Sequence, residues 1–269
     1  WFCRVRSHRC CVFCPFSLAL LRISSSLHKL LGSGGRVLLL LALVTLPLQA
    51  QLAQVLPQRA LSKWKIPAGN YSGITPLGNN RFAVVSDKAP SLGYFEWEIL
   101  QDSLTGQVTH VSALGFRPLQ SREKQPEGAL DVEDLVFDAQ RGAVWIANEG
   151  DQTLTAYDTA TQQRAATMDI PPYFSRDSIF ANLGFEALAH DAVTQLWCST
   201  SESPLRADAP ARPEQLLPKI TLNLRLAFWD STFTVRRIVP YRMATSQLSR
   251  QARYYLQGVP ALCFLPNGS

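Results

Sequence analysis

Four glutamates occupy matching positions in two similar stretches of the sequence, and together they could bind a metal ion. Glu133–Glu149 reads EDLVFDAQRGAVWIANE, and Glu186–Glu202 reads EALAHDAVTQLWCSTSE. Each stretch begins and ends with Glu, and each carries Leu at its third position and Asp-Ala at its sixth and seventh. Because carboxylate oxygens are the preferred ligands of hard cations, the four glutamates favour a Ca²⁺ site.

A β-hairpin would bring the two glutamates of each stretch together. Apolar runs flank turn residues near the middle of each stretch, which is typical of strand, tight turn, strand. In regular register Glu133 lies opposite Glu149, and Glu186 lies opposite Glu202, about 5 Å apart. Like charges in such pairs destabilise a sheet, and a bound cation would compensate for them. The alternative is that these acids are solvated residues at the rim of the sheet.

Two further stretches follow the same pattern. Ser72–Lys88 has Ile74 at the third position, a turn of Gly and Asn, and a strand that ends at Asp87. Asp87 is therefore added to the predicted metal ligands. Pro260–Ser269 begins the pattern a fourth time, with Leu262 at the third position. Constant hairpins at unequal spacing favour the blades of a β-propeller, whose outer strands and loops vary.

The sequence thus predicts an all-β protein whose fold is a β-propeller of about six blades when complete. Helix signals are scarce, and short runs rich in Val, Ile, Phe and Trp alternate with turn residues. Since a propeller removes its sheet edges by closing its ring, four partial units indicate C-terminal truncation, with about two blades missing. Trp145 and Trp197 differ by one position within their stretches. We therefore expect one hairpin to have a bulge or a turn of different length.

The net charge of +5 arises from the first 50 residues. They contain 6 of the 26 Lys and Arg residues and no Asp or Glu, which leaves 20 basic and 21 acidic residues in 51–269. Nucleic-acid binding requires a basic surface that neutralises phosphates. The balance of charges therefore predicts no nucleic-acid partner.

The N-terminal region is predicted to be removed from the mature protein. Residues 36–50 combine Arg36, the apolar run VLLLLALVTL and the small residue Ala50, as in a secretory signal peptide. The run is too short for a comfortable membrane span, although a buried strand or an anchor is the alternative. Residues 1–35 are interpreted as an upstream or non-native leader; a zinc cluster of their four Cys is the disfavoured alternative. We expect a secreted or periplasmic protein with one domain over 51–269 and no membrane span after cleavage.

From about Ile66 to Ser269 the sequence resembles the phytase-like β-propeller family, which is described as having esterase-like activity. Its most specific part is Phe185-Glu186 followed by Glu202. Members usually have Gly after the motif Glu, where this chain has Asp134 and Ala187. The matching stretches are Tyr71–Ile74, Val85–Lys88, Asp131–Leu135, Val144–Glu149, Asn182–Ala189, Glu202–Leu205 and Arg237–Tyr241.

The resemblance implies an exported propeller with acidic and some basic residues around one end of its central channel. Related phytases bind Ca²⁺ there, where the metal bridges the substrate phosphate and activates water. Lys88 and Arg176 could then hold the substrate anion, although Arg176 could instead be a surface residue or an ion-pair partner. We expect a monomer with calcium as cofactor that hydrolyses a small-molecule ester or phosphoester.

The catalytic residues are not identified, because the sequence has no GxSxG nucleophile motif. The alternative function is a non-enzymatic propeller that binds a ligand or a partner, with calcium in a structural role.

Overall fold

The computed structural model describes residues 56–87, 89–120, 130–209, 221–243 and 257–265. From Arg59 onward the described residues belong to one compact unit, while Leu56–Gln58 belong to a second unit. The predicted leader, the predicted signal peptide and Lys88 lie outside the described residues.

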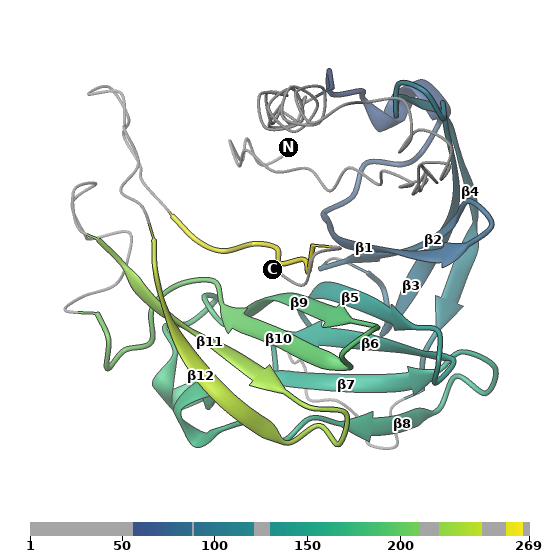
Figure 1. The fold of residues 1–269 in the computed structure, drawn as a ribbon. Helices are drawn as coiled ribbons and strands as arrows, with labels where there is room; N and C mark the ends of the chain where they lie inside the picture. The colour runs from purple at the N-terminus through teal and green to yellow at the C-terminus, as the bar shows by residue number, and fades with distance from the viewer. Residues whose placement is uncertain (1–55, 88, 121–129, 210–220, 244–256, 266–269) are drawn as a thin grey trace, which may run out of the picture. The chain divides into compact units, whose positions relative to one another are not determined.

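Twelve strands of the described chain form three four-stranded antiparallel sheets (Figure 1). Within each sheet, strands that are consecutive in sequence pair with one another. The first sheet comprises β1 (Tyr71–Gly78), β2 (Arg81–Ser86), β3 (Gly93–Gln101) and β4 (Val108–Pro118). The second comprises β5 (Val132–Asp138), β6 (Ala143–Asn148), β7 (Thr153–Asp158) and β8 (Arg164–Thr167). The third comprises β9 (Phe185–Asp191), β10 (Leu196–Ser201), β11 (Asn223–Trp229) and β12 (Val235–Arg242).

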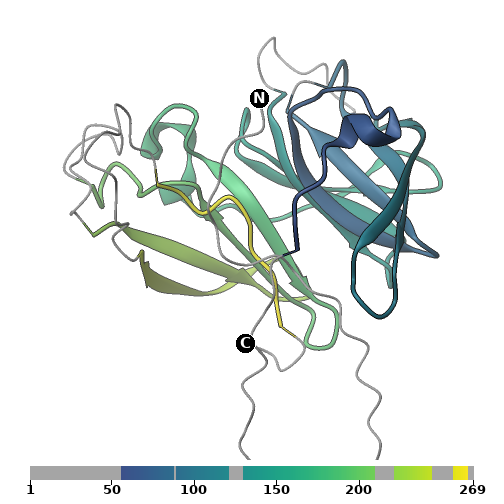
Figure 2. The ribbon, with the colours of Figure 1, turned by 90° about the horizontal axis from the view of Figure 1, so that it is seen from above.

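The first strands of the three sheets are neighbours, because β5 contacts both β1 and β9. Four-stranded up-and-down sheets whose first strands lie side by side are arranged as successive propeller blades. The all-β, propeller-like prediction is therefore confirmed (Figure 2). The described residues also form three short 3₁₀ helices, η2 (Leu61–Trp64), η3 (Pro172–Phe174) and η4 (Arg176–Ser178). Among the described residues, no helix is long and apolar enough to cross a membrane.

The core forms apolar layers between the blades. All six residues of β6 are buried, because the second sheet packs on both of its faces. Val144 and Ile146 join Ala83 and Val85 of β2 in one cluster, while Trp145 belongs to the cluster on the opposite face. Alternate residues of a strand point to opposite faces, so a strand covered on both sides must be apolar throughout.

The two tryptophans meet between the second and third blades, and the expectation of an unequal hairpin is wrong. The β5–β6 turn and the β9–β10 turn both span four residues. Trp145 pairs with Val136 and Trp197 pairs with His190, so they point to opposite faces of their own sheets. Since opposite faces of neighbouring blades pack together, the two ring centroids lie 4.9 Å apart.

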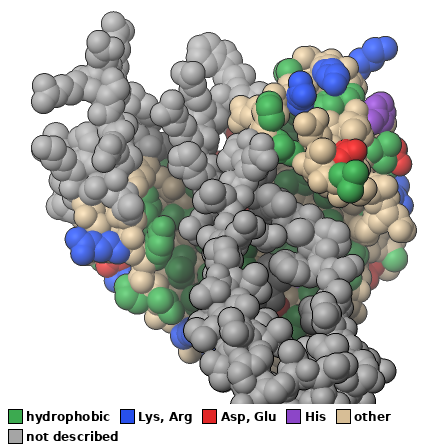
Figure 3. Space-filling model, turned by 45° about the horizontal axis from the view of Figure 1, so that its top comes forward, with side chains coloured by type: hydrophobic (Ala, Val, Ile, Leu, Met, Phe, Trp, Pro, Cys, Tyr) green, Lys and Arg blue, Asp and Glu red, His purple; other side chains and the backbone are tan. Residues whose placement is uncertain are grey.

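The predicted fourth hairpin is described only as far as Leu265. Gln257–Leu265 carries no regular strand, but Leu262 and Phe264 pack against buried residues of β9, β10 and β11. The predicted Pro-Asn-Gly turn at 266–268 lies outside the described residues. On the face shown in Figure 3, Lys and Arg side chains stand in small groups among neutral and hydrophobic ones.

Candidate functional site

Acidic side chains gather where the first strands of the three blades begin. Glu133, Glu149 and Glu186 each offer a carboxylate oxygen, and these oxygens all lie within 4.8 Å of one another. Asp87, Asp131 and Glu133 form a second group that meets the same limit. Ligand oxygens on opposite sides of a Ca²⁺ ion are about 4.8 Å apart, because each lies about 2.4 Å from the metal. Both groups are therefore compact enough for one cation, and Glu133 belongs to both.

A β-bulge in each first strand positions the acids. In β5, Val132 pairs with Asn148 and Asp134 pairs with Ala147, which leaves Glu133 as the extra residue. Glu186 is the extra residue of the same bulge in β9. A bulge turns the side chain of its extra residue away from the regular alternation. The predicted pairing of Glu133 opposite Glu149 is therefore wrong in register, as is that of Glu186 opposite Glu202.

The second acid of each hairpin lies directly after the second strand. The backbone amides of Asp87, Glu149 and Glu202 occupy equivalent positions, since each donates to the carbonyl two residues before the bulge. The acceptors are Asn70, Asp131 and Gly184, at 3.2, 2.7 and 2.6 Å. The structure thus brings Asp87, Glu133, Glu149 and Glu186 into the two close groups. Glu202 is outside these groups among the described residues, yet its charge raises the pKa of Glu186.

Burial and mutual repulsion disfavour the charged forms of these acids. Burial, followed by the charges of Asp131, Glu149 and Asp87, raises the pKa of Glu133 to about 8. Burial, followed by the charges of Glu133 and three other acids, raises the pKa of Glu186 to about 9. A cation among the carboxylates would favour their ionised forms and so reverse these shifts.

Glu149 is the most deeply buried acid of the cluster and is only 5% exposed. Its Oε1 accepts a hydrogen bond from the backbone amide of Gly184 in the next blade. Its Oε2 is buried and has no hydrogen-bond partner in the described structure. Burial raises the pKa of this carboxyl, while the Gly184 amide opposes the shift. A buried carboxylate oxygen without a donor is a suitable position for a metal ligand.

Gly184 approaches Glu149 closely because it has no side chain. A Cβ atom there would collide with the side-chain amide of Gln152. Gln152 is itself buried, and its Nε2 donates to the Glu149 carbonyl at 2.8 Å. Glu149, directly after β6, is therefore fixed by Gln152 of the turn that follows and by the Gly184 amide of the neighbouring blade.

Asp134, directly after the bulge residue of β5, is also buried. Its Oδ1 accepts from the Leu135 amide and its Oδ2 from the Leu188 amide, both at 2.8 Å. Burial raises the pKa of Asp134 to about 7, although these two amides oppose the shift.

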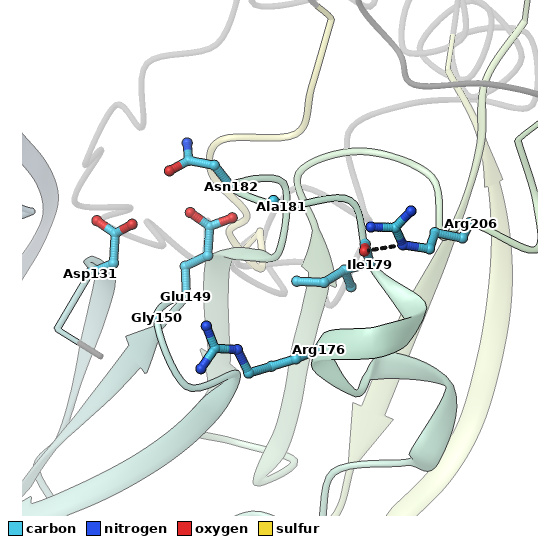
Figure 4. Close-up of a pocket in the computed structure, with 8 residues that line it drawn as sticks. All are labelled: Asp131, Glu149, Gly150, Arg176, Ile179, Ala181, Asn182 and Arg206. Carbon is cyan, nitrogen blue, oxygen red and sulfur yellow. Dashed lines mark hydrogen bonds between the residues drawn. The ribbon is translucent and has the colours of Figure 1, made fainter. Parts of the chain in front are cut away.

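A pocket of about 320 Å³ adjoins the acidic cluster (Figure 4). Asp131 and Glu149 contribute its acidic side, and the side chain of Arg176 in η4 extends toward the Glu149–Gly150 segment. Arg206 contributes a second guanidinium, whose Nε donates to the Ile179 carbonyl at 2.6 Å. The lining residues are Asp131, Glu149, Gly150, Arg176, Ile179, Ala181, Asn182 and Arg206.

Sequence reasoning placed Arg176 at the site but missed Asp131 and Arg206. Asp131 could have been found, because it lies two residues before Glu133 in the same repeat. Arg206 carries no such signal; it reaches the pocket because its backbone amide donates to the Ser178 carbonyl, 28 positions earlier, at 2.9 Å.

The family comparison covers most of the chain. A family model described as "Phytase-like: Esterase-like activity of phytase" matches residues 66–269, which is 204 of the 269 residues. The chain belongs to the phytase-like family. Comparison with curated proteins gives no match. Membership in the phytase-like family supports a hydrolase-like function for this chain.

Proposed function

We propose that this phytase-like chain is an exported, calcium-dependent hydrolase of a small phosphoester or carboxyl ester. The observation that carries the proposal is the convergence of Glu133, Glu149 and Glu186 from two blades. Three carboxylates this close repel one another strongly unless they share protons or a cation. Ca²⁺ suits oxygen ligands of this kind outside the cytosol, where we place a monomeric mature protein.

Each part of the site has a role in this proposal. Glu133, Glu149 and Glu186 would hold the cation, with Asp87 and Asp131 beside them and Glu202 contributing charge. The bound cation would polarise the ester oxygen and lower the pKa of a water molecule. Arg176 and Arg206 bind the anionic part of a phosphoester, and Lys88 is a further candidate for this role. Arg206 is already oriented by its bond to Ile179, so less conformational entropy is lost on binding.

A binding propeller with structural calcium is the second candidate. It is favoured by the position of the acids, which lie where β1, β5 and β9 adjoin. A cation at this point joins successive blades and stabilises the fold whether or not a substrate is cleaved.

The test measures stability and turnover together on the full chain. Thermal melts and hydrolysis of p-nitrophenyl phosphate and p-nitrophenyl acetate are recorded with calcium and with a chelator. The hydrolase requires a calcium-raised Tm together with calcium-dependent turnover. Glu186→Gln should abolish both effects, whereas Glu98→Gln in β3, outside the cluster, should keep them. A raised Tm without turnover favours the binding propeller, and no calcium response contradicts the metal site.

Export is tested separately by N-terminal sequencing of protein recovered from the medium or periplasm. Cleavage after Ala50 is the expected result. Protein that keeps residues 36–50 and stays in the cytoplasm would contradict export.

A further inference from the structure

Asp134 lies at the centre of the three first strands. A Cβ atom added to Gly73 of β1 would lie 2.6 Å from Oδ1 and 2.7 Å from Cα of Asp134, so β1 passes directly beside it. On the other side, Oδ2 accepts from the Leu188 amide of β9 at 2.8 Å. One side chain of β5 therefore meets both neighbouring blades.

The contacts of Asp134 link two of the carboxylates of the acidic cluster. Asp134 follows Glu133, the extra residue of the β5 bulge, and Leu188 lies two residues after Glu186, the extra residue of the β9 bulge. The bond from Leu188 to Asp134 thus ties one bulge to the other. This hydrogen bond opposes the separation of the two bulges that repulsion between the two glutamates would otherwise cause.

We propose that Asp134 is a positioning residue that holds the bulges of β5 and β9 together, so that Glu133 and Glu186 remain within reach of one cation. The inference rests on the calcium site of the proposed function. The equivalent positions in the other two blades are Gly73 and Ala187, whose side chains cannot accept hydrogen bonds. Among the three first strands, a carboxyl at this position is therefore found only in β5, which carries Glu133 and lies beside the strand that carries Glu186.

The boundary between β1 and β5 supplies a matched control. There Thr75 Oγ1 accepts from the Phe137 amide at 3.1 Å, a side-chain bond to the backbone of the next blade. Thr75→Val removes this bond with little change in volume. It lowers stability without touching the contact between Asp134 and Leu188.

The experiment measures calcium binding by titration calorimetry on the full chain, with calcium alone as the probe. We expect Asp134→Ala to weaken calcium binding about 10- to 100-fold, as loss of partners behind metal ligands does. Asp134→Asn should weaken it less, because one amide oxygen still accepts a bond. Thr75→Val should leave the Kd within about twofold of the wild-type value, even where its Tm falls, because the contact that orders the ligands is intact.

Two results would overturn the inference. One is a Kd for the Asp134 variants equal to that of the wild type, since a merely structural role lowers Tm alone. The other is an unchanged separation of the Glu133 and Glu186 oxygens in a crystal structure of Asp134→Asn grown without metal. This structure decides the inference even if the wild-type chain binds no calcium, a result that overturns the proposed calcium site itself. If Asp134→Ala does not fold, both readouts still apply to Asp134→Asn.

Discussion

Neighbouring blades are joined by side-chain hydrogen bonds at both boundaries, but different chemical groups form these bonds at each boundary. At the first boundary, between β1 and β5, Ser72 Oγ donates to the Val132 carbonyl at 2.8 Å and Thr75 Oγ1 accepts from Phe137. At the second boundary, between β5 and β9, the carboxylates of Asp134 and Glu149 accept from Leu188 and Gly184. Hydroxyls keep their charge state across physiological pH, whereas buried carboxylates do not. Of the hydrogen bonds compared, those of the second boundary are therefore the ones that depend on protons and cations.

The same contrast exists at the bulges. Ser72 occupies the position in β1 that Glu133 and Glu186 occupy in β5 and β9. A hydroxyl there forms one neutral bond and completes its contact. Two carboxylates there leave unbalanced charge, which is the cost of a site that can bind a cation.

The largest expected effect comes from the apolar part of the second boundary. Trp197→Ala should lower the free energy of unfolding by about 3–5 kcal/mol, because it leaves a cavity beside Trp145. Ile146→Ala at the first boundary should cost about 2–5 kcal/mol. Urea denaturation measures both, with the exposed Leu114→Ala as control. An effect of Trp197→Ala as small as that of Leu114→Ala would contradict the packing.

The second effect is a dependence of stability on pH that arises from the acidic cluster. Glu133 and Glu186 have folded pKa values of about 8 and about 9, above the ordinary value of 4.5. Below pH 4.5 these groups are protonated in both states, and above it only the unfolded state ionises freely. In chelator, stability should therefore fall between about pH 5 and 9, by up to about 1.4 kcal/mol per pH unit for each carboxyl.

Glu186→Gln supplies the test of this dependence. The variant should flatten the fall and be more stable than the wild type at pH 8 in chelator. Calcium should flatten the wild-type curve as well, since a cation favours the ionised forms. If the free energy of unfolding falls equally with pH for the wild type and Glu186→Gln in chelator, the carboxyl of Glu186 is not the source of the pH dependence.

A smaller effect is expected where the turns of the second boundary meet. Arg141 donates to Asp138 Oδ2 and Gln195 Oε1, both at 2.8 Å, and to the Ser231 carbonyl at 3.1 Å. Arg141→Ala should cost about 1–3 kcal/mol, because Asp138 is buried and loses its charged partner. Arg141→Lys should recover part of this loss, as measured by urea denaturation. Equal losses for both variants would mean that the fork-shaped contacts, rather than the charge, stabilise the turns.

The smallest effect is expected at the first boundary. Ser72→Ala removes one neutral bond to Val132 and should cost about 1 kcal/mol, equally at pH 5 and pH 9. Thermal melts at the two pH values measure this difference. A loss that changes with pH would show that the bond from Ser72 to Val132 also responds to the charge of the acidic cluster.

The sequence was sufficient to predict the blades, because the pattern of apolar strand, turn and apolar strand recurs with similar residues at matching positions. Of the five acids that the sequence predicted as ligands, the structure brings together four, Asp87, Glu133, Glu149 and Glu186, because acids recur at matching positions of the hairpins. It did not predict that β5 and β9 share the same bulge, because an extra residue that shifts the register of both hairpins equally leaves their sequence patterns alike. The opposed faces of Trp145 and Trp197 were visible in their numbering, but the reason for them lies in contacts between blades. Arg206 and the role of Asp134 could not be predicted for the same reason, because their partners are distant in the sequence.

The meeting of Trp145 with Trp197 shows that each blade presents one face to the blade before it and the opposite face to the blade after it. Every contact between blades is therefore head-to-tail, and its two surfaces are different. A substitution on one face alters a single boundary and is not duplicated by symmetry. Repeated units joined in this way can diverge one junction at a time, so hydrogen bonds from hydroxyls at one junction and to carboxylates at the next can coexist in a chain built from copies of the same hairpin.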